Sequence, residues 1–498
     1  MWTSINQALN IIDNFVWGVP LMVLIIAGGL LLTIRLGLLQ IRKLPLALKW
    51  MLQNEEGGKG EISSFSALCT ALSATIGTGN IVGVATAVCA GGPGALFWMV
   101  VAAFLGMATK YSEGLLAVKY RTVAEDGHSL GGPFYYIELG MGKNFKWLAK
   151  IFAFFGVCVG LFGIGTFSQV NGISSAVHGF FDPNDAFTVK ILPFLGEYSW
   201  SVVIASLILS FCVAAVLIGG VKRIASVSQI IVPFMAVIYF VFAVILICCN
   251  ITKVPAAFAT IVTAAFSPKA ITGGAVGSML IAMQKGVARG IFSNEAGLGT
   301  GSIAAAAAQT NSPVRQGLVS MTGTFIDTII ICTLTGLSIV LTGAWQVEGL
   351  EGVQVTTYAF QHGLPFPAQF SSFILMLCLV FFAFTTILGW DYYSERCLEY
   401  LSGGNMKHVK IFRWIYILAV FIGPYMTVSA VWTIADIFNG LMAIPNMIAL
   451  FALSGVIVKE TRAFFQHAKE EARAEHQIPS RFNWLATAPQ RKRWRFCM

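Results

Sequence analysis

The stretch that decides the fold is Ser64-Phe-Ser-Ala-Leu-Cys-Thr-Ala-Leu-Ser-Ala-Thr-Ile-Gly-Thr-Gly-Asn-Ile-Val-Gly-Val-Ala-Thr-Ala-Val88. It has the length and the apolar ends of a membrane-spanning helix, but Gly77-Thr-Gly-Asn80 interrupts its centre. A glycine in a helix interior costs about 1 kcal/mol relative to alanine, and unwound backbone at bilayer depth is tolerated only in a cavity or inside protein. Half-helix ends offer N–H groups to anions and free carbonyls to cations. The stretch predicts a binding site for a small charged solute; a glycine face for helix packing is the alternative.

The composition of the 498 residues is that of a membrane protein. Hydrophobic residues make up 56% of the chain, charged residues 11%, and the mean hydropathy is +0.76. Soluble domains carry about 25% charged residues, and a spanning helix needs roughly twenty mainly apolar residues. We therefore expect an all-α polytopic membrane protein of about eleven transmembrane helices, a count that the interrupted seventh segment leaves open by one. The expected segments are 17–40, 64–88, 95–118, 147–178, 200–219, 225–249, 271–308, 317–342, 371–391, 411–430 and 431–457.

The charges of the loops predict the orientation in the membrane. Asp13 is the only charge before the first segment, so the segment lacks the positive start of a cleaved signal peptide; Arg35, Arg42, Lys43 and Lys49 follow it. Because Lys and Arg gather in cytoplasmic loops, we expect a bacterial plasma (inner) membrane protein with the N-terminus outside and the C-terminus in the cytoplasm. In that topology the outside loops carry only three lysines: Lys190, Lys253 and Lys269.

The net charge of +9 follows mostly from these loops and does not predict nucleic-acid binding. The tail, residues 459–498, holds nine basic residues together with Trp494 and Phe496. This mixture suits adhesion to an anionic inner leaflet; a solvated tail is the alternative. The ten cysteines show no CxxC or His/Cys ligand spacing, and no GxSxG, HExxH or Walker A sequence occurs. We therefore predict that the protein is not an enzyme and has no cofactor.

A second interrupted segment lies at 271–308. It contains Gln284-Lys-Gly-Val-Ala-Arg-Gly290 and Ser293-Asn-Glu-Ala-Gly-Leu-Gly-Thr-Gly301. When the first helix is set aside, each broken segment opens a set of five, and such paired breaks point to the central site of a transporter. Sets with an odd number of helices must be inverted relative to each other; coincidental glycines in a channel are the alternative. The expected parts are an extra helix with a cytoplasmic loop (1–60), two inverted five-helix repeats (61–250 and 251–458) and the basic tail (459–498).

Six motifs, in this order along residues 15–460, carry a resemblance to a known family. They are Ala71-Leu-Ser-Ala-Thr-Ile-Gly-Thr-Gly-Asn-Ile-Val-Gly-Val-Ala-Thr86, Gly91-Gly-Pro-Gly-Ala-Leu-Phe-Trp-Met99, Gly106-Met-Ala-Thr-Lys-Tyr-Ser-Glu113, Gly131-Gly-Pro-Phe-Tyr-Tyr136, Phe292-Ser-Asn-Glu-Ala-Gly-Leu-Gly299 and Phe325-Ile-Asp-Thr328. Together they resemble the alanine or glycine:cation symporters. The resemblance implies the inverted five-plus-five amino-acid-transporter fold and uptake of alanine or glycine driven by sodium, or by protons in some members.

The resemblance also implies site residues. The N–H groups of Thr78 and Gly79 would hold the substrate carboxylate, while the carbonyls of Ser73 and Ile76 and the hydroxyls of Thr385 and Thr386 would hold sodium. Bonding of both hydroxyls to their own helix is the alternative for the threonine pair. Carbonyls freed around Lys285–Gly290 would accept the substrate ammonium group. The full set of expected substrate contacts is Thr75, Gly77, Thr78, Gly79, Asn80, Phe167, Gln169, Asn171, Gln284 and Gly286.

Several other polar residues lie inside apolar segments, and most of them can be interpreted in two ways. Gln169 and Asn171 are buried amides that contact either the substrate or a neighbouring helix, and Phe167 is either a lid over the substrate methyl group or a core residue. Lys110 and Glu113 have the i, i+3 spacing of a local ion pair. Asp327 is the candidate for proton or cation coupling, and a structural pair with Lys285 or Arg289 is the alternative.

We therefore predict a sodium-coupled secondary symporter that imports small neutral amino acids by alternating access. A proton-coupled or glutamine-preferring relative is one alternative, and a channel is another. The long acidic loop Trp345–Phe370 is a candidate outer gate. The expected partners are alanine or glycine, Na⁺ or H⁺, and the lipid bilayer; the sequence does not predict the oligomeric state.

Overall fold

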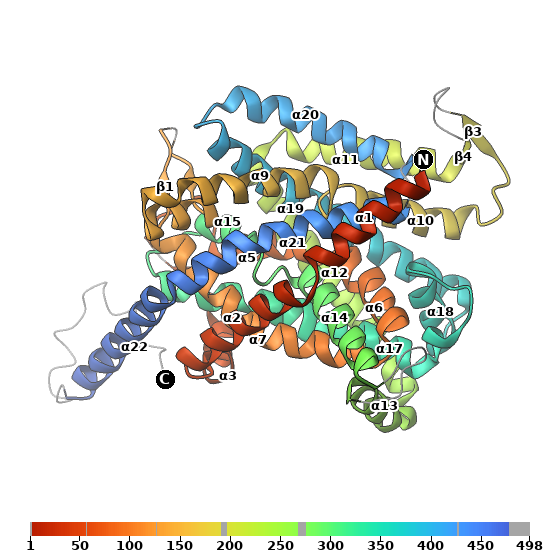
Figure 1. Ribbon diagram of the computed structural model, residues 1–498, viewed down its shortest axis with the longest axis horizontal. Coiled ribbons are helices and arrows are strands. Elements are labelled where there is room, and N and C mark those ends of the chain that lie inside the picture. The colour runs from red at the N-terminus through yellow and green to blue at the C-terminus, as the bar shows by residue number, and fades with distance from the viewer. Residues whose placement is uncertain are drawn as a thin grey trace, which may run out of the picture.

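The computed structural model describes residues 2–55, 57–125, 127–190, 197–266, 275–425 and 428–477. Its fold is a bundle of long helices that run roughly along one direction, with two short hairpins at its surface (Figure 1). The α-helices are α1 (Trp2–Val16), α2 (Val19–Arg35), α3 (Leu39–Arg42), α4 (Leu44–Met51), α5 (Ser64–Thr75), α6 (Val84–Gly91), α7 (Gly94–Lys119), α8 (Pro133–Tyr135), α9 (Lys146–Phe162), α10 (Phe167–Phe181), α11 (Trp200–Leu217), α12 (Gly220–Cys249), α13 (Val254–Phe266), α14 (Ala275–Asn294), α15 (Gly301–Ala306), α16 (Pro313–Thr324), α17 (Thr333–Thr342), α18 (Val353–Gly363), α19 (Ala368–Leu401), α20 (Met406–Ile422), α21 (Val428–Ala452) and α22 (Ser454–Gln477).

Tighter or wider helical turns and two hairpins complete the chain. The turns are η1 (Gly79–Gly83), η2 (Tyr136–Met141), η3 (Lys143–Phe145), η4 (Ile251–Lys253), η5 (Phe325–Cys332), η6 (Ala344–Gln346) and η7 (Gly423–Tyr425). The strands are β1 (Thr122–Val123), β2 (Ser129–Leu130), β3 (Thr188–Lys190) and β4 (Glu197–Ser199). Both pairs are antiparallel, with Thr122 opposite Leu130 and Val189 opposite Tyr198. The all-α polytopic fold expected from the sequence is therefore confirmed.

Eight helices of the described chain are long and apolar enough to cross a membrane, or nine if the bent pair Ser64–Thr75 and Gly79–Gly91 counts as one span. The two other expected segments correspond to the broken α14–α15 and to the 17-residue α20. Residues 271–274 and 426–427 of those segments lie outside the described residues. Each expected segment thus contains helix, and the helices of the segments 64–88, 147–178 and 271–308 are interrupted at residues 76–78, 163–166 and 295–300.

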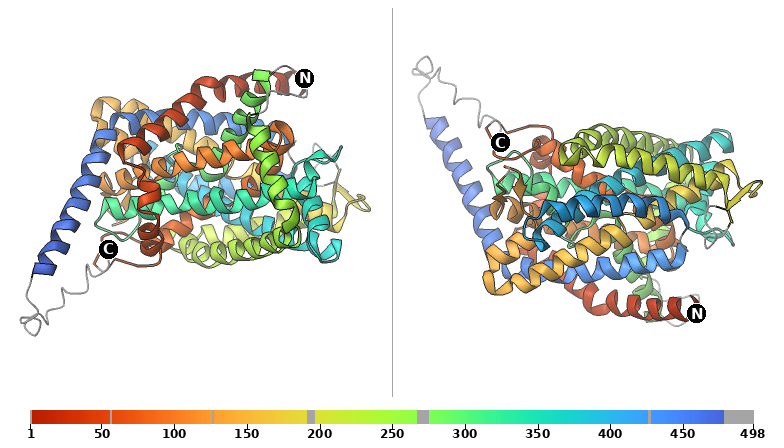
Figure 2. Two further views of the ribbon diagram at one scale, coloured as in Figure 1. Left: turned by 90° about the horizontal axis from the view of Figure 1, so that it is seen from below. Right: turned by 90° about the horizontal axis from the view of Figure 1, so that it is seen from above.

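Helices also occur where no transmembrane segment was expected. They include α1, α13 and α18, of which the last lies in the acidic loop 345–370. The last expected segment, 431–457, ends early, because α21 stops at Ala452 and α22 starts at Ser454. α22 extends away from the bundle at its lower left in Figure 1, and Figure 2 shows the same projection from two other sides.

α7 packs against α2, α14, α15 and α16. It begins after Gly92, whose φ of +72° turns the chain, and Pro93, which suits a helix start. Its sequence is apolar on almost all sides, as is typical of a buried helix, and it is buried from Gly106 to Val118. This buried stretch includes Lys110 and Glu113, which lie next to the second interrupted segment.

Candidate functional site

The first interruption, termed break one, separates α5 from η1 and α6. Ile76 ends α5 with a non-helical ψ of 89°, η1 starts at Gly79, and the two helical pieces meet at 52°. The side chains of Ile76, Thr78 and Asn80 are fully buried. Break one therefore lies inside the protein, where unwound backbone needs polar partners.

Two side-chain amides accept hydrogen bonds from the freed N–H groups of break one. The N–H of Gly77 donates to Asn80 Oδ1 (2.9 Å), and that of Thr78 donates to Gln169 Oε1 (3.0 Å). Gln169 Nε2 in turn donates to the carbonyl of Ile164 (2.9 Å), which fixes the orientation of the amide. Two neighbouring backbone N–H groups thus meet two oxygen acceptors, as they would in binding a carboxylate.

The carbonyl side of break one faces α19. Thr386 Oγ1 lies 3.3 Å from the carbonyl of Ile76 and also donates to Phe382 of its own helix (3.0 Å). Thr385 is turned to its own helix, with bonds to the carbonyls of Phe381 (3.1 Å) and Phe382 (3.0 Å). Ser73 Oγ donates to Thr70 of α5 (2.8 Å). Of the two threonines, Thr386 is the one that the structure places beside break one.

The glycines of break one have little free space. A Cβ added at Gly77 would lie 2.5 Å from Thr386 Oγ1 and 2.9 Å from Gln169 Oε1. A Cβ at Gly79 would lie 3.2 Å from the Phe292 ring and 3.2 Å from Ser293 Cα. Gly77 therefore separates the expected cation side from the expected carboxylate side, and Gly79 allows the second interrupted segment to approach.

The second interruption, termed break two, spans residues 295–300 between α14 and α15. Glu295, Gly297 and Gly299 all have positive φ values, of 56°, 95° and 83°. Glu113 Oε1 accepts the N–H groups of Gly297 (3.0 Å) and Gly299 (3.1 Å) and the side-chain amide of Asn446 (2.8 Å). A buried carboxylate therefore satisfies the backbone of break two.

The local ion pair expected between Lys110 and Glu113 does not form. Glu113 reaches break two instead, and Lys110 Nζ has no hydrogen-bond partner among the described residues. The i, i+3 spacing was a poor guide here because the freed N–H groups of break two compete for the same carboxylate. The spacing therefore predicted the wrong partner for Glu113. Asn446 is a buried amide in an apolar segment, as Gln169 is, but it was not among the expected site residues.

Asp327 joins the two breaks. Its Oδ1 accepts from Asn80 Nδ2 (2.7 Å), and its Oδ2 accepts from Ser293 Oγ (2.8 Å) and Thr328 Oγ1 (2.6 Å). Arg289, an expected alternative partner, forms a bidentate ion pair with Asp436 (2.9 and 2.8 Å). Asp327 is thus bonded to neutral donors from both interrupted segments.

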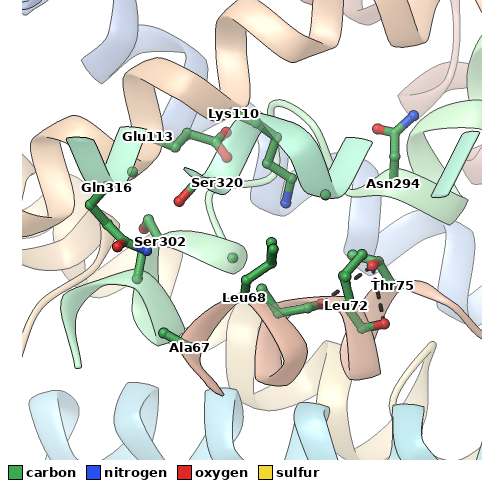
Figure 3. Close-up of a pocket in the computed structure, with 15 residues that line it drawn as sticks. Ala67, Leu68, Leu72, Thr75, Lys110, Glu113, Asn294, Ser302, Gln316 and Ser320 are labelled. Atoms are coloured by element: carbon green, nitrogen blue, oxygen red, sulfur yellow. Dashed lines mark hydrogen bonds between the residues drawn. The ribbon is translucent and has the colours of Figure 1, made fainter. Parts of the chain in front are cut away.

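A small cavity with a mixed polar and apolar lining lies between α5, α7, α15 and α16 (Figure 3). Lys110 and Ser320 point into it from one side, and Leu68, Leu72 and Thr75 line the opposite side. The Thr75 hydroxyl bonds to Ala71 and Leu72 of its own helix (3.3 Å each). Thr75 therefore faces this cavity rather than the amides of Gly77 and Thr78.

The remaining expected contacts have separate locations. Gln284 Nε2 donates to the carbonyl of Trp17 (3.1 Å), and Gly286 packs closely on α7, so the structure does not bring either to break one. Phe167 stacks edge-on against Phe162 (6.3 Å between ring centres). Asn171 is buried, with 5% of its surface exposed.

The known proteins that resemble this chain are membrane transporters. The model of the sodium:alanine symporter family matches residues 2–478. A transporter of Haemophilus influenzae is 54% identical (94% of this chain, 97% of that protein), and the sodium/alanine symporter AgcS of Methanococcus maripaludis is 46% identical (93% and 98%). The probable sodium/glutamine symporter GlnT of Bacillus subtilis is 35% identical (94% and 92%). Among solved structures, MhsT in complex with L-phenylalanine has a TM-score of 0.54 at 12% identity, covering 82% of this chain and 93% of that chain, which shows a shared fold.

Proposed function

This chain belongs to the sodium:alanine symporter family, and from that premise we propose that it imports small neutral amino acids, such as alanine and glycine, together with sodium. Members of this family are membrane transporters and not enzymes. The observation that carries the proposal is the arrangement of break one. Within residues 76–78, two N–H groups and one carbonyl meet oxygen groups of different side chains. An amino acid carried together with a cation needs such a site, with N–H groups for its carboxylate and a separate set of oxygens for the cation.

We place the substrate carboxylate at the N–H groups of Gly77 and Thr78, one residue before the Thr78 and Gly79 pair expected from the sequence, because these two groups meet side-chain oxygen acceptors. The side chains of Asn80 and Gln169 already supply oxygen acceptors there, at 2.9 and 3.0 Å. A carboxylate is a better acceptor than an amide because its hydrogen bonds are charge-assisted. Binding therefore exchanges amide oxygens for carboxylate oxygens without leaving a buried donor unsatisfied.

The sodium ion binds between α5 and α19. The carbonyls of Ser73 and Ile76 and the hydroxyls of Thr385 and Thr386 are the proposed ligands, since a hard cation prefers oxygen. Thr386 supports this assignment most, because its hydroxyl already lies 3.3 Å from the carbonyl of Ile76. The close approach of Phe292 to Gly79 supports a small substrate side chain.

Alternating access requires a cover on each side of the two breaks. On one side, α18 contacts η1 through the Thr356 hydroxyl and the carbonyl of Ile81 (3.1 Å). On the other, Arg121 donates to the carbonyls of Lys59 (2.8 Å) and Ala308 (2.8 Å), tying the loop before α5 to the end of α15. We assign these contacts to the outer and inner covers. Inward movement of each positive charge gains about 2.3 kcal/mol per 100 mV of membrane potential.

Uptake of labelled alanine into proteoliposomes tests the proposal. A sodium gradient alone should drive accumulation, whereas lithium or proton gradients alone should not, and unlabelled glycine should compete more strongly than glutamine. Accumulation with a proton gradient alone, or stronger competition by glutamine, would replace the proposal with the proton-coupled or glutamine-preferring alternative. Uptake that saturates poorly and never exceeds the outside concentration would indicate a channel.

A further inference from the structure

A basic groove lies outside the transport site, between the α2–α4 segment and α22. Five cationic side chains line it: Arg35, Arg42, Lys43, Arg462 and Lys469. No Asp or Glu lines the groove in the described part of the chain. About 1840 Å³ of empty space, part of it open to solvent, separates the two walls. We propose that this groove binds the headgroup of an anionic phospholipid.

The position of the groove, at the ends of two membrane spans, supports a lipid as the ligand. The span Gln7–Arg35 ends at the groove, and the span Thr433–Ala452 ends just before α22 begins. Arg35 Nη1 donates to Ser454 Oγ (2.5 Å), which ties the ends of these two spans together. Headgroups lie where spans leave the hydrocarbon, so a lipid phosphate can reach the groove without leaving the bilayer.

The groove also has apolar walls, which favour a lipid over a small soluble anion. Trp50 and Phe464 pack edge to face with ring centres 6.0 Å apart, and Lys43 Nζ lies 4.4 Å above the Phe465 ring. Ile34, at the membrane end of the groove, is 67% exposed. The cations bind a phosphate, and the aromatic and aliphatic surface is available to the glycerol and the first acyl carbons.

The cationic groups of the groove are available for this ligand. Among the described residues, the five side chains form no ion pair with a carboxylate, and Glu460 of α22 pairs with Lys119 instead (2.7 Å). The end of the chain cannot neutralise the groove, because residues 478–498 contain five Lys or Arg and no Asp or Glu. The groove therefore presents a positive charge to an anion from outside the chain, and Arg is well suited to hold phosphate oxygens.

Native mass spectrometry of the full-length protein in detergent tests the proposal, with phosphatidylglycerol and phosphatidylcholine of identical chains as probes. We expect the wild type to bind phosphatidylglycerol at least tenfold more tightly than phosphatidylcholine. The double variant Arg42→Gln/Arg462→Gln should lose at least fivefold in that affinity and keep alanine binding. The control Lys407→Gln/Lys410→Gln removes two charges from exposed positions at the start of α20 and should not change it.

Three results would overturn the proposal. Equal affinity for both lipids would show that the net negative charge of the headgroup is not recognised. Equal losses in the two double variants would show a general charge effect. Complete displacement of phosphatidylglycerol by millimolar inorganic phosphate would show a site for a soluble anion. Because alanine binding is measured on the same samples, failure of the lipid proposal is distinguishable from misfolding and from failure of the transport site.

Discussion

Asn80 Nδ2 donates a 2.7 Å hydrogen bond to Asp327 Oδ1, although 247 residues separate the two in the chain. The same Asn80 holds the N–H of Gly77, and the same Asp327 accepts from Ser293 beside break two. A movement of either interrupted segment must therefore displace the other or break a buried hydrogen bond. We take this connection as the mechanical coupling between the two breaks.

The variant Asp327→Asn tests that connection. One acceptor oxygen becomes an NH₂ group that faces donors, which should lower the free energy of unfolding by about 1–3 kcal/mol and reduce alanine uptake. Because we assign Asp327 a positioning role, the pH profile of the remaining uptake should match that of the wild type. A shifted profile together with an unchanged melting temperature would instead assign a transported proton to Asp327.

The two threonines of α19 should differ in their effect on sodium. Thr386→Val removes the hydroxyl beside Ile76, so the sodium concentration for half-maximal uptake should rise at least fivefold. Thr385→Val removes a hydroxyl that bonds to its own helix and should have the smaller effect. Sodium titrations of uptake measure both. Unchanged sodium dependence in the double valine variant would remove the pair from the site.

Glu113 should be important for stability rather than for ion selectivity. Glu113→Gln keeps the shape of the side chain but weakens its charge-assisted bonds to Gly297 and Gly299, at an expected cost of about 1–3 kcal/mol. Thermal unfolding in detergent measures the loss, and Glu348→Gln in the acidic loop is a control. An unchanged melting temperature would show that another group satisfies break two.

Local sequence signals predicted more of the fold than of the site. The glycine-rich interruptions at Gly77 and Gly297 were visible because helix breakers act within a few residues, and runs of apolar residues predicted the spans. The roles of Glu113 and Gln284 were not visible, because each depends on a partner more than 180 residues away. α1 and α18 were missed because short or amphipathic helices lack a spanning apolar run.

The orientation of the chain in the membrane is a further prediction. The excess of Lys and Arg in alternate loops predicts residue 1 outside and residue 498 in the cytoplasm. A reporter that is active only in the cytoplasm should therefore be active at the C-terminus and inactive at the N-terminus. Activity at both ends would require an even number of spans, which would contradict the inverted repeats.

The most direct measurement of the central claim, that the amino acid binds at break one, is alanine binding to purified Gly77→Ala and Gly83→Ala. The methyl group at Gly77 would lie 2.5 Å from Thr386 Oγ1 and 2.9 Å from Gln169 Oε1. A methyl group at Gly83 would approach only Arg289 Cδ, at 4.0 Å. Binding in the presence of sodium should weaken at least tenfold in folded Gly77→Ala and stay within twofold of the wild type in Gly83→Ala. Wild-type affinity in Gly77→Ala would contradict the assignment of the site.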